Sequence, residues 1–194
     1  MVYLQDIIKE VMDANLLEND LNRIIYVDLD GVLVDFDNGF KAISGGVDKK
    51  TYIEKYGYPG LWKLINSYGE DWWANLNWMA DGPKLWSVIQ NKNVKVLTSG
   101  TVRNTGTFAI NGKKRWVQNH LGQIETIVVN SSSDKKNYAR PGDILIDDLY
   151  SNIEGWIQNK GIGIYHRNAD QTIEKLNIVI NTQKETYGYS WSNV

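Results

Sequence analysis

Two aspartates, Asp28 and Asp30, end a run of apolar residues that begins at Ile24. Residues i and i+2 of a β-strand project to the same side, so both carboxylates should leave the strand end together. Two carboxylates at such close range repel one another unless a cation or a shared proton compensates their charge. The pattern therefore predicts a metal site, or a pair of groups for nucleophilic and acid–base chemistry.

Further polar groups follow the apolar runs that are expected to flank the first one. Thr98, Ser99 and Gly100 offer two hydroxyls and a flexible backbone whose N–H groups can bind a phosphate. Asp147 and Asp148 end a later run and form a second acidic pair. If these runs are neighbouring parallel strands, all of these groups meet at the carboxyl edge of one sheet, where open α/β folds bind ligands.

Two lysines after the third run, Lys135 and Lys136, supply positive charge at the same edge. Together with Thr98 and Ser99, Lys135 is expected to donate to the phosphoryl oxygens, and Lys136 is the alternative to it. With Mg²⁺, which prefers a few carboxylates together with water and substrate phosphate, these groups suit phosphoryl transfer. We expect Asp28 to attack phosphorus and form an aspartyl-phosphate. Asp30 is expected to protonate the leaving oxygen and then to deprotonate the attacking water.

Strands and helices must position these groups. Five short apolar, β-branched runs have strand character, at residues 24–28, 94–98, 125–129, 143–147 and 162–165. Helical patterns precede the second, third and fifth run, at residues 83–90, 113–121 and 153–159. Strands that are apolar throughout and alternate with helices predict a parallel sheet covered on both faces. The predicted fold class is α/β, a three-layer Rossmann-like core around a parallel five-stranded sheet.

The gap of about sixty residues between the first two strands is too long for a single crossover helix. It contains three short helical patterns, which predict a small helical cap inserted after the first strand, around residues 49–55, 61–68 and 71–75. We expect the cap at residues 38–82 and the catalytic core at residues 1–37 and 83–194. Other expectations are an additional amphipathic helix and two polar loops, at residues 1–20, 100–112 and 131–142 respectively.

The composition limits the classes of partner. The chain has 194 residues, 42% of them hydrophobic, with a net charge of −2 and no cysteine, and its sequence pI is about 5.7. Such a chain has no overall attraction for nucleic acid or anionic membranes, and it cannot form disulfides or cysteine-type zinc sites. No stretch resembles a signal peptide or a membrane span. We therefore expect a cytoplasmic protein with a small-molecule phosphate ester as its partner and no membrane partner. The sequence is also compatible with a homodimer.

Three motifs resemble, in order and spacing, those of the haloacid dehalogenase (HAD) superfamily of phosphatases, namely residues 28–32, 97–99 and 147–148. Longer segments resemble its 5′(3′)-deoxyribonucleotidase branch in particular, namely residues 28–36, 113–117 and 142–148. The resemblance implies a HAD-type core with an inserted cap and Mg²⁺ as the cofactor. The implied reaction is hydrolysis of deoxyribonucleoside monophosphates to nucleoside and phosphate.

The resemblance also assigns roles to single residues. It implies that Asp28 is both nucleophile and metal ligand, and that Asp30 is the acid/base and a ligand through its backbone carbonyl. Asp148 would bind the metal directly, and Asp147 would support it. Lys113 matches a lysine that lies near the phosphate in the nucleotidases.

Aromatic residues are candidates for contact with the base of a nucleotide. The resemblance implies that Phe36 lies against the nucleobase. Three tryptophans of the predicted cap, Trp72, Trp73 and Trp78, are candidates for closing over it. These residues are expected to form a base pocket, although large aromatic side chains also serve as core of small helical subdomains.

Other interpretations stay open on the sequence alone. The same chemistry could serve a sugar phosphate or a nucleic-acid 3′-phosphate end. A polynucleotide needs a basic track, which an acidic protein lacks overall, although Arg103 and residues 113–115 could form a local one. A nucleotide-binding module without catalysis is the alternative from another class, and the presence of both Asp28 and Asp30 counts against it. By default, residues 113–115 form a solvated helix face.

Overall fold

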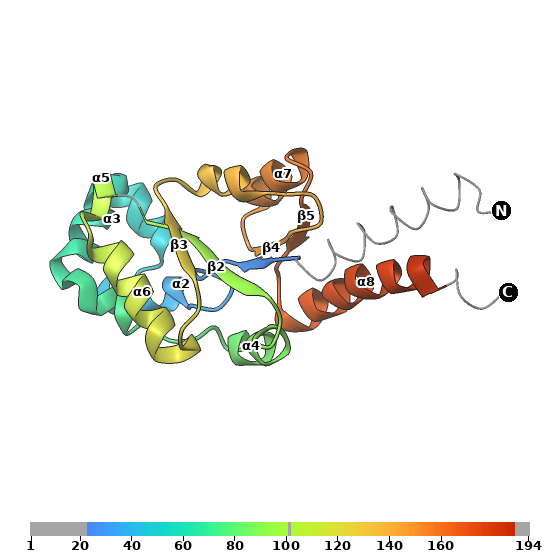
Figure 1. The fold of residues 1–194 in the computed structure, drawn as a ribbon. Helices are drawn as coiled ribbons and strands as arrows, with labels where there is room; N and C mark the ends of the chain where they lie inside the picture. Colours follow the sequence, from blue (N-terminus) through green and yellow to red (C-terminus); the bar gives the residue numbers. More distant parts are fainter. Residues whose placement is uncertain (1–22, 101, 189–194) are drawn as a thin grey trace, which may run out of the picture.

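The computed structural model describes residues 23–100 and 102–188, so the predicted helix over residues 1–20 lies outside the described residues. In the described ranges, five parallel strands form one sheet in the order β3-β2-β1-β4-β5 (Figure 1). The strands are β1 (Ile25–Val27), β2 (Val94–Ser99), β3 (Thr126–Val129), β4 (Ile144–Asp147) and β5 (Ile162–Tyr165). The predicted α/β class and the parallel five-stranded sheet are confirmed, and the topology is consistent with a Rossmann-like fold.

The central strands are apolar on both faces. β1 lies in the middle of the sheet, where Val27 pairs with Val96 of β2 and with Ile146 of β4. Every residue of β1 and of β4 is buried. Because neither face of these strands can be left to solvent, helices must cover both.

Helices lie on both faces of the sheet and give the molecule three layers (Figure 1). One face carries η1 (Ser132–Tyr138) and α7 (Tyr150–Gln158), and the other carries α4 (Gly82–Ile89), α6 (Phe108–Leu121) and α8 (Ala169–Gly188). In the described part of the chain, none of the helices has the length and apolar character that crossing a membrane requires.

The alternation of side chains along the strands decides which layer each site residue faces. Tyr26 packs on Trp156 of α7, with 5.2 Å between the ring centroids. Its neighbours Ile25 and Val27 belong instead to the buried cluster that includes residues of α4, α6 and α8. When the two-residue period is continued, Asp28 leaves β1 on the side of η1 and α7.

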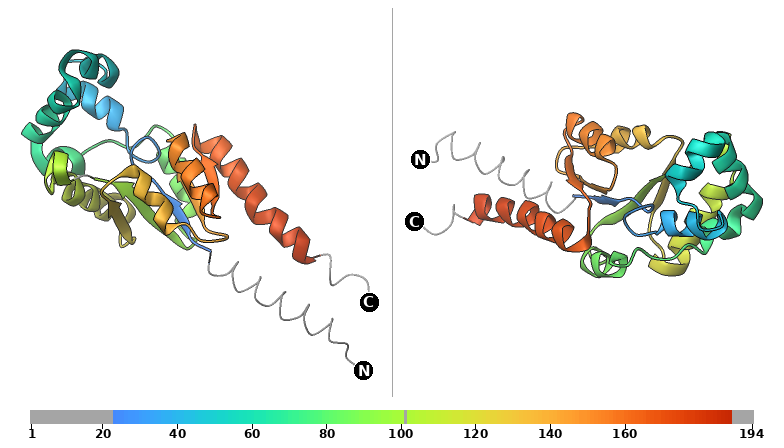
Figure 2. Two further views of the ribbon diagram at one scale, coloured as in Figure 1. Left: turned by 90° about the horizontal axis from the view of Figure 1, so that it is seen from above. Right: turned by 180° about the vertical axis from the view of Figure 1, so that it is seen from behind.

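The segment between β1 and β2 folds into α2 (Phe36–Ile43) and α3 (Lys49–Ala74), which lie beyond the carboxyl end of the sheet, at the opposite end from α8 (Figure 1, Figure 2). The backbone of α3 is not helical at Gly57 and Gly69, so the three predicted helical patterns correspond to its three pieces. The predicted cap boundary at residue 38 falls inside α2.

The cap, defined here as α2 and α3, is packed on the core through α6. Gly112 of α6 approaches α3 so closely that a Cβ atom there would lie 2.4 Å from Cβ of Trp73 and 2.6 Å from the carbonyl oxygen of Glu70. Arg115 pairs with Glu70 at 3.1 Å and also with Asp71. Apolar side chains of α2 and α3 belong to the same buried cluster as β1. One hydrophobic core therefore runs from the sheet into the cap.

The predicted loop at residues 100–112 is largely helical, so that prediction is wrong. Val102–Thr105 forms α5, and α6 begins at Phe108 rather than at residue 113. The buried face of α6 starts with Ala109 and Gly112. Because residues this small contribute little to a hydrophobic pattern, the first turns of the helix were predicted to be loop.

The predicted loop at residues 131–142 also contains helix, since η1 occupies its first half. Asp134 accepts a hydrogen bond of 3.0 Å from the backbone N–H of Ser131 and so stabilises the start of this short 3₁₀ helix. The polar composition that suggested a loop is the composition of a helix N-terminus.

Candidate active site

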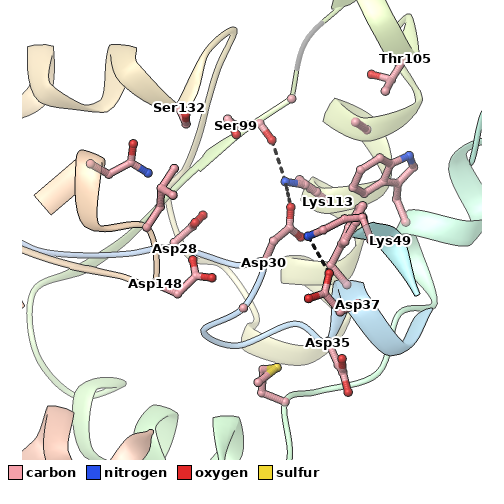
Figure 3. A pocket seen from close by; sticks show the side chains of 18 of the residues that line it. Asp28, Asp30, Asp35, Asp37, Lys49, Ser99, Thr105, Lys113, Ser132 and Asp148 are labelled. Carbon is pink, nitrogen blue, oxygen red and sulfur yellow. Dashed lines mark hydrogen bonds and ion pairs between the residues drawn. The ribbon is translucent and has the colours of Figure 1, made fainter. Parts of the chain in front are cut away.

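The carboxyl ends of β1, β2 and β4 open into a cavity of about 1390 Å³ between the core and the cap (Figure 3). Its lining includes Asp28 and Asp148 at the strand ends, Ser99 of β2, and Lys49 and Trp73 of α3. Groups that lie far apart in the sequence therefore share one cavity, at the sheet edge where the sequence predicted a site.

Three carboxylates gather at one side of this cavity. One oxygen each of Asp28, Asp147 and Asp148 lies within 4.8 Å of the others. Lys135 of η1 reaches two of them, with its Nζ 2.8 Å from Oδ2 of Asp28 and 2.6 Å from Oδ2 of Asp147. When all four groups are ionised, three negative charges and one positive charge leave a net charge of −2. The structure thus brings Lys135 to the carboxylates and leaves Lys136 exposed.

The two aspartates of the second acidic pair have different surroundings. Asp147 is completely buried. Its oxygens accept hydrogen bonds from Lys135, from the side-chain amide of Asn152 at 3.0 Å to each oxygen, and from the backbone N–H of Leu149 at 2.8 Å. Asp148 is exposed and lines the cavity. Asp147 therefore anchors the cluster, while Asp148 presents its carboxylate to a ligand.

The pKa values in this cluster reflect the crowding of like charges. Desolvation and then the charge of Asp28 raise the pKa of Asp147 to about 6. Desolvation and the charges of Asp28 and Asp147 raise the pKa of Asp148 to about 7. Burial lowers the pKa of Lys135, but the two neighbouring carboxylates outweigh it and raise that pKa above its usual value. A cation bound here would relieve the repulsion between the carboxylates.

The turn after β1 fixes Asp28 and leaves room for Asp148. Oδ1 of Asp28 accepts a hydrogen bond of 2.8 Å from the N–H of Leu29. Gly31 has a φ of +77°, and a Cβ atom on it would lie 2.2 Å from Oδ2 of Asp148. Because an L side chain rarely adopts this φ and a Cβ here would displace the carboxylate of Asp148, the position favours glycine.

Asp30 contacts α6 rather than the acidic cluster. Its Oδ2 accepts a hydrogen bond of 2.7 Å from Nζ of Lys113 (Figure 3). The same ammonium donates to Oγ1 of Thr98 at 3.0 Å and to the carbonyl oxygen of Ser99 at 2.6 Å. These acceptors use all three of its N–H donors. Desolvation raises the pKa of Asp30, although Lys113 opposes the shift.

Lys113 differs most from its default interpretation as part of a solvated helix face. It is only 3% exposed, so that interpretation is wrong for this residue. In the present arrangement it positions Asp30 and Thr98, and its contact with a phosphate stays a prediction. The helical period of α6 carries the signal for its burial, because Lys113 lies four residues after Ala109 and three before Trp116, both of them buried.

The residues predicted to bind phosphate at the end of β2 differ in access. Ser99 and Gly100 line the cavity, but the N–H of Gly100 donates to the carbonyl oxygen of Val129 and is therefore not available to an anion. Thr98 is 1% exposed and does not line the cavity. Ser132, which the sequence analysis did not single out, adds a hydroxyl from η1 to the lining.

Two of the four aromatic residues predicted for the base pocket line the cavity. Phe36 and Trp73 do so, with 5.6 Å between their ring centroids. Trp72 and Trp78 do not line it, and the prediction that they close over a base stays a prediction. Trp72 packs edge-on against Phe36, and Trp78 packs on Trp116 of α6.

Sequence reasoning missed other residues of the lining. Lys49 at the start of α3 lies 5.2 Å from the ring centroid of Phe36 and pairs with Asp37 at 2.7 Å (Figure 3). Trp62 of α3 and Asn152 of α7 also line the cavity. Asn152 has a usable signal, since it lies in the first turn of the helix that follows the acidic pair. Lys49 and Trp62 in the cap have no comparable signal in the sequence.

The acidic cluster fits a hard divalent cation. Its donors are carboxylate oxygens, the ligand type that Mg²⁺ and Ca²⁺ prefer. The net charge of −2 that remains after Lys135 is counted equals the charge such an ion would neutralise. Asp147 is buried and fully hydrogen-bonded, as expected of a residue that supports the direct ligands.

Comparisons with known proteins identified no relative of this chain. A scan against protein-family models found no match to this chain, and neither did a search of curated proteins. Function is therefore inferred from the residues of the site and from the motifs that they form.

Proposed function

We propose that this protein is a Mg²⁺-dependent phosphomonoesterase that acts through an aspartyl-phosphate and hydrolyses deoxyribonucleoside monophosphates. The observation that carries the proposal is the separate placement of two aspartates from one strand end. Asp28 lies in the acidic cluster beside Lys135, and Asp30 lies beside Lys113. The order and spacing of the motifs that resemble HAD phosphatases support the same assignment.

Asp28 is the nucleophile in the proposed mechanism. One of its carboxylate oxygens bonds to phosphorus while the bond from phosphorus to the ester oxygen breaks. Asp30, whose pKa is raised by desolvation, gives its proton to the departing oxygen. Asp30 then takes a proton from water, whose oxygen attacks phosphorus and releases inorganic phosphate and Asp28.

Other residues of the site hold these two groups in place. Lys135 orients Asp28 through the 2.8 Å ion pair and sets a positive charge beside the transferred group. Lys113 orients Asp30. Ser99 and Ser132 present hydroxyls at the cavity wall for the phosphoryl oxygens.

The residues that would bind Mg²⁺ are Asp28 and Asp148 through their carboxylates and Asp30 through its backbone carbonyl, with Asp147 in support. When bound, the cation neutralises phosphate charge that would otherwise repel the nucleophile. A deoxynucleotide is the proposed substrate because the aromatic residues Phe36 and Trp73, which are 9% and 3% exposed, line the same cavity as the acidic cluster. A chain without cysteine suits a reducing compartment, and we propose a cytoplasmic location.

Phosphate release by the purified full chain tests the proposal. The panel comprises 5′- and 3′-deoxynucleoside monophosphates and several sugar phosphates, each with Mg²⁺ and with EDTA. We expect the highest kcat/KM for a deoxynucleotide and no activity with EDTA. Preference for a sugar phosphate over dUMP and dTMP would overturn the nucleotide assignment, and release from none of the substrates would overturn the phosphatase assignment.

A further inference from the structure

A groove on the cap continues the cavity. It has a volume of about 720 Å³, and its lining residues are Tyr58, Pro59, Trp62, Lys63, Asn66 and Asn104. Tyr58, Trp62 and Asn104 also line the main cavity. A ligand held at the acidic cluster could therefore extend along α3 without leaving the protein surface.

The size of the cavity exceeds what a mononucleotide needs. Pockets for small molecules typically have volumes of about 300–1,000 Å³. The main cavity alone has about 1390 Å³, and the groove adds to it. The groove therefore offers space beyond that of the main cavity.

The chemistry of the groove suits an unstacked nucleotide. Tyr58 is 62% exposed, and Trp62 is partly exposed beside it, so aromatic surface is open to a base. The side-chain amide of Asn66 donates to the backbone carbonyl of Asn104 at 2.7 Å. Its Oδ1 is buried and has no hydrogen-bond partner among the described residues. Such an acceptor is rarely left unsatisfied, and an N–H donor of a base, such as N3–H of thymine, would satisfy it.

The charge of this part of the cap favours a phosphodiester. From Lys49 to Lys63, four lysines stand against Glu54, and Asp37 of α2 pairs with Lys49 at 2.7 Å, which leaves a local charge of +2 in a chain whose net charge is −2. Lys63 lines the groove, and Lys49 lines the adjoining cavity. Lysines interleaved with aromatic residues are the pattern with which proteins bind single-stranded nucleic acid. The acidic overall charge therefore does not exclude a short oligonucleotide.

We propose that the groove binds the nucleotide next to the one that carries the scissile phosphate, and that the protein dephosphorylates the ends of short single-stranded DNA. This inference rests on the proposed phosphatase function and names a substrate class for the same site. The terminal phosphate lies at Asp28, the terminal base lies against Phe36 and Trp73, and the next base lies on Trp62.

Substrates of increasing length test the groove in the full chain. The kcat/KM for phosphate release is measured with thymidine 5′- and 3′-monophosphate and with the thymidine dinucleotides that carry a 5′- or a 3′-terminal phosphate. We expect one of the two dinucleotides to exceed its mononucleotide by about tenfold, the contribution of one stacked base. Equal or lower values for both dinucleotides would overturn the inference while leaving the phosphatase proposal intact.

Matched substitutions locate the effect. Lys63→Gln and Asn66→Ala lie in the groove but not in the main cavity, so we expect them to reduce the dinucleotide advantage several-fold and to leave mononucleotide hydrolysis unchanged. Lys41→Gln removes the same charge from an exposed position on α2 outside the groove and should change neither. Equal losses on both substrates, or the same loss in Lys41→Gln, would contradict a groove that binds the second nucleotide.

Binding without turnover separates the two proposals. Calorimetry with the Asp28→Asn protein and Mg²⁺ compares the Kd of the phosphorylated dinucleotides with those of the mononucleotides. Tighter binding of one dinucleotide, reversed by Lys63→Gln, supports the groove even if no substrate is hydrolysed. Equal Kd values for dinucleotides and mononucleotides overturn it whatever the activity.

Discussion

The two ends of the cavity hold their charged groups in different ways. At the strand end, the side chains of Lys113 and Lys135 are 4% and 1% exposed, and they pair with Asp30 and Asp28 respectively. At the cap end, the side chain of Lys49 is 43% exposed, and the aromatic ring of Tyr58 is largely open to solvent. A buried charge held by ion pairs stays in one geometry, whereas an exposed lysine or ring can adapt to its ligand.

Under the proposed function, this contrast places the chemistry at the strand end and recognition of the base at the cap end. A reaction at phosphorus needs its nucleophile and its acid in fixed positions, and the sheet supplies them. Recognition of a base tolerates variation, and the cap supplies open surface. Changes at the strand end should therefore act through the chemical step whether or not the substrate carries a base, and changes at the cap end should affect only substrates with a base.

The largest effect is expected from Asp28→Asn. The amide is a poor nucleophile, so kcat for every phosphate ester should fall by at least about a thousand-fold. The fold should persist, because one negative charge is removed from a cluster that carries a net −2. Steady-state phosphate release and far-UV circular dichroism check both parts. Full activity of the folded variant on any substrate would contradict the assignment of the nucleophile.

A smaller loss, which depends on the leaving group, is expected from Asp30→Asn. General acid catalysis contributes about 10²–10⁴-fold where the departing oxygen needs a proton. The rate at which the phospho-enzyme forms should fall strongly with a deoxynucleotide as substrate. It should fall only slightly with p-nitrophenyl phosphate, because the p-nitrophenolate ion leaves without a proton. Single-turnover release of nucleoside and of p-nitrophenol measures the two rates. Equal losses on both substrates would argue against Asp30 as the acid.

Gly31→Ala tests how closely the turn after β1 fits the acidic cluster. The added Cβ would collide with Asp148, and the positive φ costs about 1–2 kcal/mol of stability for an L residue. Gly45→Ala is the matched control, because Gly45 has a φ of +73° with nothing within 4 Å of its Cβ position. Both variants should lose thermal stability, but only Gly31→Ala should raise the Mg²⁺ concentration needed for half-maximal activity. An unchanged Mg²⁺ requirement in Gly31→Ala would contradict the role of Asp148.

Phe36→Ala addresses the cap end. Loss of one stacking surface should lower kcat/KM for deoxynucleotides by about tenfold and leave p-nitrophenyl phosphate unaffected. Trp78→Phe, at a ring that does not line the cavity, should change neither substrate. If Phe36→Ala lowers both substrates equally, the ring serves only as core and the contrast between the two ends fails.

The smallest effect is the pH dependence of the metal-free protein. The pKa of Asp148 is raised to about 7, above the ~3.9 of an unfolded aspartate. The folded state therefore binds more protons than the unfolded state between these values, and this contribution to stability is lost as the pH rises through about 7. Asp148→Asn should raise Tm more at about pH 8 than at about pH 5, and Mg²⁺ should raise the wild-type Tm most at the higher pH. Scanning calorimetry with EDTA and with Mg²⁺ measures both. A Tm difference between variant and wild type that does not change with pH would contradict the crowding of the cluster.

The same contrast explains how much of the molecule its sequence predicts. Strand positions are predictable because continuous apolar runs have few alternatives, and the residues at strand ends follow from them. Asp28, Asp147 and Lys135 meet as expected because parallel strands end at one edge of the sheet. Asn152 joins them only through the first turn of the helix that follows, which a strand-based argument does not consider.

Residues on helices were harder to place. Lys113 is charged and therefore suggests solvent, yet α6 carries it to the interior, where Asp30 and Thr98 accept its hydrogen bonds. Trp72 and Trp73 are adjacent in sequence but about 100° apart around α3, and only the packing of α3 on α6 decides which of them lines the cavity. Tertiary packing of this kind leaves no local pattern in a single sequence.

The central claim is that Asp28 becomes covalently phosphorylated during turnover. Rapid acid quench of the reaction with p-nitrophenyl phosphate and Mg²⁺, followed by peptide mass spectrometry, tests it most directly. We predict one phosphoryl group on the peptide that contains Asp28, a larger amount in Asp30→Asn, where the base that activates water is missing, and none in Asp28→Asn. Turnover with no label on this peptide, or with the label on another residue, would contradict the account.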